Sequence, residues 1–159
     1  MNCTCYFQSP IGLIKITGTE LGISEIIFVE EKIGTSSSFI LKVVEDGIHQ
    51  LEKYFQGKLK IFTLKLDQKG TEFQQSVWNE LSNISFGKTI SYQALAIQLG
   101  DKKSTRAVAS ANAKNKLAIV IPCHRVINSN NELTGYAWNL ERKKCLLEFE
   151  KYTQQINLF

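Results

Sequence analysis

The chain has 159 residues, a mass of 18.0 kDa and a formal net charge of +4 at pH 7. Its 43% hydrophobic and 21% charged residues are typical of a folded globular protein and argue against disorder. No uncharged apolar run approaches the roughly 20 residues of a membrane-spanning helix, and the start MNCTCYFQSP lacks the basic and apolar regions of a secretory signal. We therefore expect a cytoplasmic protein with reduced cysteines and no membrane association.

The first half of the chain predicts a small α/β domain. Four segments rich in β-branched and aromatic residues predict strands: residues 3–8, 13–18, 23–30 and 61–66. Between the third and fourth, a loop over residues 34–38 precedes a helix with one apolar stripe: Leu41, Val44, Ile48, Leu51 and Phe55. Residues 67–70 look like a linker. This half contains no evident catalytic motif.

The second half begins with three predicted helices. Thr71 and Gln74 form a capping box, and the helix that they begin is expected to bury Phe73 and Trp78. Two shorter helices follow, over residues 92–100 and 105–115, with Ser91 and Ser104 as their expected N-caps. Because a tight turn joins these two helices, the pair predicts a helix-turn-helix, which is a DNA-binding motif.

The rest of the second half completes a winged helix-turn-helix in this interpretation. The apolar run 118–121 predicts a strand that ends at Pro122. A wing-like stretch over residues 128–139 and a last helix over residues 140–150 follow.

The positive charge is concentrated in the second half. Residues 1–70 carry eight lysines and eight acidic residues, so their charges cancel. Between Lys88 and Arg125, seven basic residues accompany one acidic residue, Asp101. This pattern favours a polyanionic partner, although a solvated basic surface has the same composition. The small residues of the second helix, AVASANA, fit close approach to nucleic acid or to another helix.

Cys123, His124 and Arg125 follow Pro122 without a spacer. A cysteine there suits core packing, metal binding, a hydrolase nucleophile or a less common reaction. A structural zinc site is disfavoured, because the chain has two histidines and no CxxC pair. We expect Cys3 and Cys5 to be packed in the core.

The stretch IPCHRVI, residues 121–127, resembles the active-site signature of the O6-alkylguanine-DNA alkyltransferases, the methylated-DNA–protein-cysteine methyltransferases. The resemblance runs from Phe73 to Glu150 through GKTISYQALA, STRAVASANAKN and GYAW, and it is weaker in the first half, where SPIGLIKITG carries it. It implies a ribonuclease-H-like α/β domain over residues 1–70. It also implies a winged helix-turn-helix domain over residues 71–159 that binds DNA and accepts the alkyl group.

The resemblance implies direct-reversal DNA repair, in which Cys123 takes the alkyl group of O6-methylguanine, or of O4-methylthymine, once and irreversibly. A free thiol is only about 3% ionised at pH 7, so the attack needs a base. In the family that base corresponds to His124, acting through a water and oriented by Glu150. Asn115 is expected to hold the turn before the nucleophile, and Tyr92 to neutralise the leaving base.

The implied partner is double-stranded DNA that contains O6-alkylguanine, contacted in the minor groove by a monomer. A stacked guanine cannot reach a buried thiol, so the nucleotide must be flipped out, and Arg106 is expected to fill its place. The expected DNA contacts are Arg106, Ala107, Tyr92, Ser104, Thr105, Lys114 and Arg125. The expected base pocket consists of Val126, Tyr136, Ala137 and Trp138.

Trp138 stands where other members can have glycine, so it is expected to narrow the pocket and disfavour O6-benzylguanine. The alternative is an outward Trp138 that stacks on the wing and stabilises it. Some members bind zinc in the first domain, but only Cys5 matches that ligand set, because Thr19 and Ser24 stand at other ligand positions. We therefore expect no metal and no cofactor.

Two other functions were weighed against repair. An alkyltransferase-like damage sensor binds the flipped base without reacting, but such proteins carry another residue at the position of Cys123. A Cys-His hydrolase needs an oxyanion hole, and neither a helix N-terminus nor a glycine nest follows Cys123. Cys145 is expected to be inert and His49 to be exposed. The expected location is the cytoplasm, associated with the nucleoid in a bacterium, or the nucleus of a eukaryote.

Overall fold

A computed structural model describes residues 1–34 and 36–156. Thr35, within the predicted loop, and residues 157–159, at the end of the predicted second domain, lie outside the described residues. The chain divides into two compact units. The first contains Met1–Lys69 together with Lys116–Ala118, and the second contains Gly70–Asn115 and the chain from Ile119 onward.

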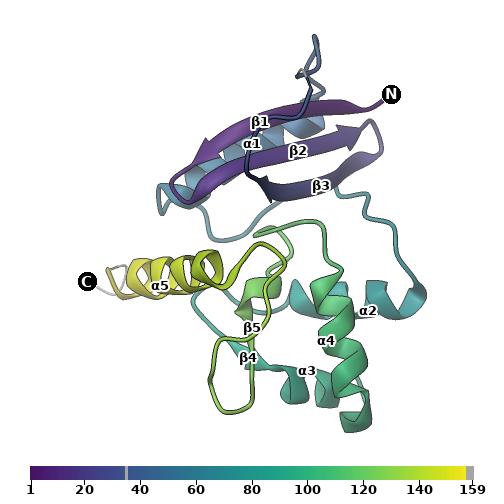
Figure 1. The fold of residues 1–159 in the computed structure, drawn as a ribbon, viewed down its shortest axis with the longest axis vertical. Helices are drawn as coiled ribbons and strands as arrows, with labels where there is room; N and C mark the ends of the chain where they lie inside the picture. Colours follow the sequence, from purple (N-terminus) through teal and green to yellow (C-terminus); the bar gives the residue numbers. More distant parts are fainter. Residues whose placement is uncertain (35, 157–159) are drawn as a thin grey trace. The chain divides into compact units, whose positions relative to one another are not determined.

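The first unit is an antiparallel sheet with one helix packed on it (Figure 1). The strands are β1 (Cys3–Ser9), β2 (Gly12–Thr19) and β3 (Gly22–Val29), in the order β1-β2-β3. Alternate residues such as Ile14, Ile16 and Ile26 are fully buried, because successive side chains of a strand point to opposite faces. The helix α1 (Lys42–Phe55) packs on this sheet through Val44, Gly47, Leu51 and Tyr54. The helix and its buried stripe are therefore as predicted, with Val44 and Leu51 in common. Gly47 and Tyr54 are buried in place of the predicted Ile48 and Phe55, one residue later in each case.

The strand predicted over residues 61–66 is wrong. Only Leu66 forms an isolated bridge, to Ile23, where the Ile23 amide donates to the Lys65 carbonyl over 2.8 Å. Ile61 is 79% exposed, so the segment lacks the buried face that its β-branched composition suggested. Its close approach requires glycine at position 22, where a Cβ atom would lie 2.9 Å from the Lys65 carbonyl oxygen.

A short piece from the second half of the sequence belongs to the first unit. Leu117 is fully buried and forms a parallel bridge with Ile26. The Ile26 amide donates to the Lys116 carbonyl over 2.8 Å, and the Ala118 amide donates to the Ile26 carbonyl over 2.9 Å. The edge of β3 is thereby paired by residues that lie five to seven positions before Cys123 in the sequence.

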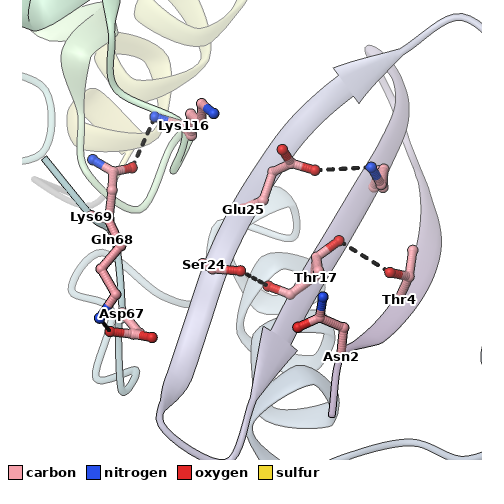
Figure 2. A pocket seen from close by; sticks show the side chains of 10 residues that line it. Asn2, Thr4, Thr17, Ser24, Glu25, Asp67, Gln68, Lys69 and Lys116 are labelled. Carbon is pink, nitrogen blue, oxygen red and sulfur yellow. Dashed lines mark hydrogen bonds and ion pairs between the residues drawn. The ribbon is translucent and has the colours of Figure 1, made fainter.

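Figure 2 shows a polar cavity of about 410 Å³ on the first unit. Lys15 pairs with Glu25 over 3.0 Å, and Lys69 pairs with Asp67 over 2.8 Å, both within its lining. The hydroxyls of Thr4 and Thr17 also bond to each other. Because these groups satisfy one another, the cavity presents no unpaired buried polar atom among the described residues.

The second unit is mostly helical, as predicted. Its helices are α2 (Glu72–Leu81), α3 (Tyr92–Gln98), α4 (Thr105–Ala113) and α5 (Leu140–Ile156). Two-residue strands β4 (Ile90–Ser91) and β5 (Val126–Ile127) pair in parallel. Figure 1 shows α3 and α4 following one another as a helical pair, and the two helices are in contact. Within the described residues, no helix is both long and apolar enough to cross a membrane.

The local signals at the helix starts have mixed outcomes. The capping box of Thr71 and Gln74 is present, and the Ser91 hydroxyl caps α3 by accepting from the Ala94 amide. Ser104 is the N-cap residue of α4, but its side chain makes no capping bond. Its hydroxyl instead donates to the Asp101 carbonyl, within a 3-10 turn that precedes the helix. Ser104 therefore occupies the predicted N-cap position, but the expected capping hydrogen bond from its side chain is absent.

Two further expectations are corrected in this unit. Trp78 is buried as predicted, with its ring nitrogen donating to the Ala111 carbonyl over 2.9 Å, but Phe73 is 40% exposed because it lies in the first turn of α2. The strand predicted over residues 118–121 is a turn in which Ile119 has a φ of +71°. A β-branched residue is strained in that region, so tertiary contacts hold the turn in place.

Candidate active site

A cavity of about 430 Å³ in the second unit contains Cys123. One wall is α4, where the small side chains of Ala109 and Ala113 leave room. The other wall is the loop from Thr134 to Ala137, and Tyr92 from the start of α3 also lines the cavity. A concave, mostly apolar site with few polar groups is typical of a small-ligand pocket.

Asparagine side chains hold the backbone that presents Cys123. Cys123 is 3% exposed and begins a 3-10 turn over Cys123–Arg125. The Asn115 side-chain amide donates to the Ile121 carbonyl over 2.9 Å, and the Cys123 amide donates to the same carbonyl over 2.8 Å. The Asn112 amide group donates to the Cys123 carbonyl over 3.4 Å. Two buried side chains therefore hold the backbone on either side of Pro122, Asn115 at Ile121 and Asn112 at Cys123.

His124 and Glu150 form a buried pair behind the cysteine. His124 Nε2 lies 2.9 Å from Glu150 Oε1 and 3.1 Å from Oε2, and neither side chain is more than 1% exposed. The other ring nitrogen, His124 Nδ1, is buried and has no hydrogen-bond partner among the described residues. The carboxylate of Glu150, from α5, thus fixes the orientation of the imidazole and leaves Nδ1 available.

Arg125 completes this network and is not a surface residue. Its Nε donates to Glu150 Oε1 over 2.7 Å, and its Nη1 donates to the Ile84 carbonyl over 2.6 Å. The guanidinium also lies over the ring of Phe86. Because Arg125 is 5% exposed and its Nε and Nη1 donate inside the unit, the structure gives it an internal role and does not favour the predicted DNA contact.

Burial dominates the protonation of the site. It raises the pKa of the Cys123 thiol to about 11, against the Asn115 hydrogen bond and the Lys143 charge, which lower it. Burial lowers the pKa of His124. Burial opposes ionisation of Glu150 as well, but His124 and Arg125 outweigh it and lower the pKa of that carboxyl. At neutral pH the site holds a thiol, a neutral imidazole and a carboxylate, so the sulfur must lose its proton during a reaction.

Lys143, on α5, is a buried cation that the sequence interpretation missed. It is fully buried, and its Nζ donates to the carbonyls of Val126, Thr134 and Gly135. A signal was available, because residues 143, 146, 150 and 153 recur at helical spacing and form the buried stripe of α5. A lysine on the same stripe as Leu146 and Glu150 indicates an internal partner.

The other predicted pocket residues are only partly brought together. Tyr92, Tyr136 and Ala137 line the cavity with Cys123, and burial raises the pKa of Tyr92. Val126 and Trp138 are not among the described residues that line it. Val126 is fully buried, and Trp138 packs edge-on against Tyr136 with ring centroids 5.2 Å apart. The cavity as described therefore does not include these two predicted residues, and Trp138 contacts a lining residue instead.

The remaining predicted DNA contacts cluster on α4. Arg106 and Ala107 are exposed in its first turn, and Lys114 is exposed at its C-cap. Ser104 and Thr105 are half-buried at its start. Small residues on α4 and a cation near its start are compatible with close approach to a polyanion, and no other cationic side chain lies within the helix.

The remaining cysteines and His49 differ in burial. Cys3 and Cys5 are buried, as predicted, while Cys145 is half-buried, and His49 is exposed on α1. Over residues 1–34 and 36–156, no group of three or more His, Cys, Asp or Glu side chains is placed to hold a metal ion.

Both halves of the chain match one family. Residues 2–68 match the family described as "6-O-methylguanine DNA methyltransferase, ribonuclease-like domain". Residues 72–152 match "6-O-methylguanine DNA methyltransferase, DNA binding domain". The predicted fold class, a ribonuclease-H-like α/β domain followed by a mostly helical DNA-binding domain, is thereby confirmed at the level of these domains.

Relatives of similar length support the match. The methylated-DNA–protein-cysteine methyltransferase of Methanosarcina acetivorans is 45% identical over 148 residues, which are 91% of this chain and 95% of that protein. The protein of the same name from Mycolicibacterium paratuberculosis is 39% identical over 147 residues, with 91% and 89% covered.

Solved structures agree with the sequence comparison. The crystal structure of Mycobacterium tuberculosis O6-methylguanine methyltransferase superposes with a TM-score of 0.85 at 35% identity, covering 96% of this chain and 94% of that one. The same organism's protein in complex with DNA gives a TM-score of 0.83 at 37% identity, with 96% and 93% covered. The chain thus belongs to the 6-O-methylguanine DNA methyltransferase family.

Proposed function

We propose that Cys123 is the methyl acceptor of a direct-reversal DNA repair reaction. The family members are methylated-DNA–protein-cysteine methyltransferases, so the reaction of this chain moves a methyl group from DNA onto one of its own cysteines. One observation favours Cys123 over the other cysteines: it lies in a cavity and is followed directly by the His124–Glu150 pair. The proposed substrates are O6-methylguanine and O4-methylthymine in DNA.

The proposed chemistry is an in-line displacement. The Cys123 sulfur forms a bond to the methyl carbon while the bond from that carbon to guanine O6 breaks. The thiol proton passes through one water to His124 Nδ1, the buried atom that has no partner among the described residues. Glu150 stabilises the resulting imidazolium, and Tyr92 protonates the leaving guanine. The product thioether is not hydrolysed, so each chain acts once.

A base is necessary because of the burial of Cys123. A thiol with a pKa of about 11 is about one part in ten thousand thiolate at pH 7. General-base assistance contributes about 10²–10⁴ in rate, and holding sulfur and methyl carbon in line adds more. The His124–Glu150 pair provides the first contribution, and the turn closed by Asn115 provides the second.

The second unit carries the DNA-binding domain of the family. We propose that α4 enters the minor groove, where Ala107 and its neighbours permit close approach. Because Cys123 is 3% exposed inside a cavity, the alkylated nucleotide must be flipped out of the duplex to reach it. Arg106 then fills the vacated place, and Tyr92 contacts the adjacent phosphate. We also propose that the chain acts as a monomer, wherever the cell keeps its DNA.

The test is a matched pair of cysteine variants on a duplex with one O6-methylguanine. Cys123→Ser should lose methyl transfer, because the serine hydroxyl ionises far less readily, and should keep its DNA affinity within about threefold, a change below roughly 0.7 kcal/mol. Cys145→Ser, the same change on α5, should transfer at the wild-type rate. Stoichiometric transfer by Cys123→Ser would show that another cysteine is the acceptor. DNA binding without transfer by the wild-type chain would instead support the damage sensor.

A further inference from the structure

Lys143 holds three backbone carbonyls around the active site. Its Nζ lies 2.7 Å from the Val126 oxygen, 3.0 Å from the Thr134 oxygen and 3.1 Å from the Gly135 oxygen. An ammonium group has three donors, and all three are used. Since the side chain is fully buried, these bonds are made away from competing water and are stronger for it.

Two of these carbonyls belong to the wall of the Cys123 cavity. Thr134 and Gly135 line it, and they lie in the stretch 128–139, which contains neither helix nor strand. The wall therefore lacks the regular backbone bonds that fix α4 opposite. The third carbonyl, of Val126, directly follows the turn that carries Cys123. One side chain thus ties the irregular wall to the nucleophile turn.

Lys143 also supplies positive charge to this site. Its Nζ lies 5.9 Å from the ring centre of Tyr92, and its charge lowers the pKa of both Cys123 and His124. Burial lowers the pKa of Lys143 itself to about 8, and the attraction of Cys123 opposes that change. Its Nζ thus contacts the carbonyl of Val126 from β5 and lies near Tyr92 from α3, and its charge acts on Cys123 and His124 from the 3-10 turn.

We propose that Lys143 is a positioning residue for methyl transfer: it fixes the Thr134–Gly135 wall over Cys123 and favours the negative charge that develops on the sulfur. The inference rests on Cys123 being the acceptor. An ammonium buried beside a reacting thiol stabilises the anion in the transition state more than the neutral thiol. Lys143 therefore acts on the rate of transfer rather than on DNA affinity.

The experiment compares Lys143→Met with Lys144→Met. Both changes remove one lysine charge from neighbouring positions of α5, but Lys144 is exposed, so it controls for net charge. The first readout is the rate at which iodoacetamide alkylates Cys123 at pH 7, below the Lys143 pKa of about 8; the modified site is located by peptide mass, and no DNA is needed. The second is the limiting single-turnover rate on duplex DNA with one O6-methylguanine, alongside the dissociation constant and the folded fraction.

We expect Lys143→Met to lower the rate of Cys123 alkylation at pH 7 by about tenfold or more, because the loss of one positive charge leaves less thiolate. Its limiting transfer rate should fall by a similar factor or more, with an unchanged dissociation constant. Lys144→Met should match wild type in each readout. A Lys143→Met protein with the wild-type alkylation rate and the wild-type transfer rate per folded molecule would overturn the inference.

Lys143→Arg keeps the proposal testable if the methionine variant does not fold. Arginine preserves the charge but changes the donor geometry, so the alkylation rate at pH 7 should stay at the wild-type value while the transfer rate falls. A lowered alkylation rate in this variant would contradict the electrostatic role, and an unchanged transfer rate would contradict the role in fixing the wall. Loss of transfer by wild type and Lys144→Met alike would refute the proposed function, and the alkylation rate at pH 7 would still test the role of Lys143.

Discussion

The two compact units fill their interiors with different kinds of residue. Among the described residues, Ser9 is the buried polar side chain of the first unit, and the rest of its buried side chains are apolar, cysteine or tyrosine. The second unit buries seven polar or charged side chains: Asn112, Asn115, His124, Arg125, Lys143, Glu150 and Thr153. Buried charges are costly even when paired, so their concentration in one unit indicates a functional demand rather than a packing solution.

The same contrast applies to the thiols. Cys3 and Cys5 are as buried as Cys123, so burial alone does not distinguish an acceptor from a packed cysteine. The difference lies in the neighbours. Cys3 Sγ bonds to the backbone at Phe39 and Leu41, whereas Cys123 is flanked by an imidazole, a carboxylate and two buried cations. Reactivity should therefore follow the polar network and not the exposure of the sulfur.

The largest expected effect comes from removing the buried carboxylate. Glu150→Gln leaves Arg125 and His124 without a charged partner, which should cost about 3 kcal/mol of unfolding free energy and slow methyl transfer about 100-fold. The control in the first unit is Glu25→Gln, which breaks the partly exposed pair with Lys15 and should cost at most about 1 kcal/mol. Urea unfolding measures the stability of each variant, and single-turnover kinetics measure its rate of methyl transfer. Equal losses of stability and rate in the two variants would contradict the difference between the units.

Next in size is the effect of the cation at the start of α4. Arg106→Ala should slow transfer from duplex DNA more than tenfold, because flipping costs a few kcal/mol and each factor of ten is about 1.4 kcal/mol. Attack on the free modified base should be unaffected, since no gap has to be filled. Lys53→Ala, an exposed cation on α1, controls for net charge and should leave both rates unchanged. Equal slowing on duplex and free base would rule out a role in flipping.

A smaller effect concerns the loss of stability at acid pH. The chain has one histidine in each unit, His49 in the first and His124 in the second, so the two units can be compared. His124 is buried with its pKa lowered from 6.5, so the unfolded chain binds a proton there that the folded chain does not. The free energy of unfolding should therefore fall as pH drops below about 6.5, and the lowered pKa of Glu150 extends the loss below pH 4.5.

Urea midpoints measured between pH 7 and pH 5 check this prediction. His124→Asn should reduce the dependence of the urea midpoint on pH over that range. His49→Asn, at an exposed position of the first unit, should show the same dependence as wild type. A slope that survives in His124→Asn would assign the acid sensitivity to another group.

The smallest expected effect is at Trp138. Since it packs on Tyr136 and does not line the cavity among the described residues, Trp138→Gly should cost about 1 kcal/mol of stability, the size of an aromatic pair. The rate of inactivation by O6-benzylguanine should change less than about tenfold, a difference below roughly 1.4 kcal/mol. A large gain in benzyl transfer would support the original expectation that Trp138 narrows the pocket.

Local chemistry made part of this structure predictable. The capping box at Thr71 and the cap at Ser91 depend on residues three positions apart, so the sequence determines them directly. The strands predicted at 61–66 and 118–121 are wrong for different reasons. Residues 61–66 have no buried face, with Ile61 exposed, whereas Ala118, Ile119 and Ile121 are buried from an irregular backbone. Composition does not distinguish these cases from a strand, because tertiary contacts decide between them. Resemblance located Cys123, His124 and Glu150, which come from two segments that no local pattern connects.

The charged residues were the least predictable. Arg125 was assigned to DNA and Lys143 was passed over, because lysine and arginine are ordinarily exposed. Both side chains are buried here, and they donate hydrogen bonds to carbonyl and carboxylate groups of distant segments. Partners such as Ile84 and Val126 are 41 and 17 positions away, and a single sequence carries no signal for those contacts.

The most direct test is to locate the methyl group after reaction. The protein is incubated with excess duplex DNA that contains one O6-methylguanine, digested, and its four cysteine peptides are compared by mass. The polar network predicts one methyl group per chain, on Cys123, with Cys3, Cys5 and Cys145 unmodified. A methyl group on Cys3 or Cys5, in the apolar interior of the first unit, would contradict the claim that the buried charges of the second unit select the acceptor.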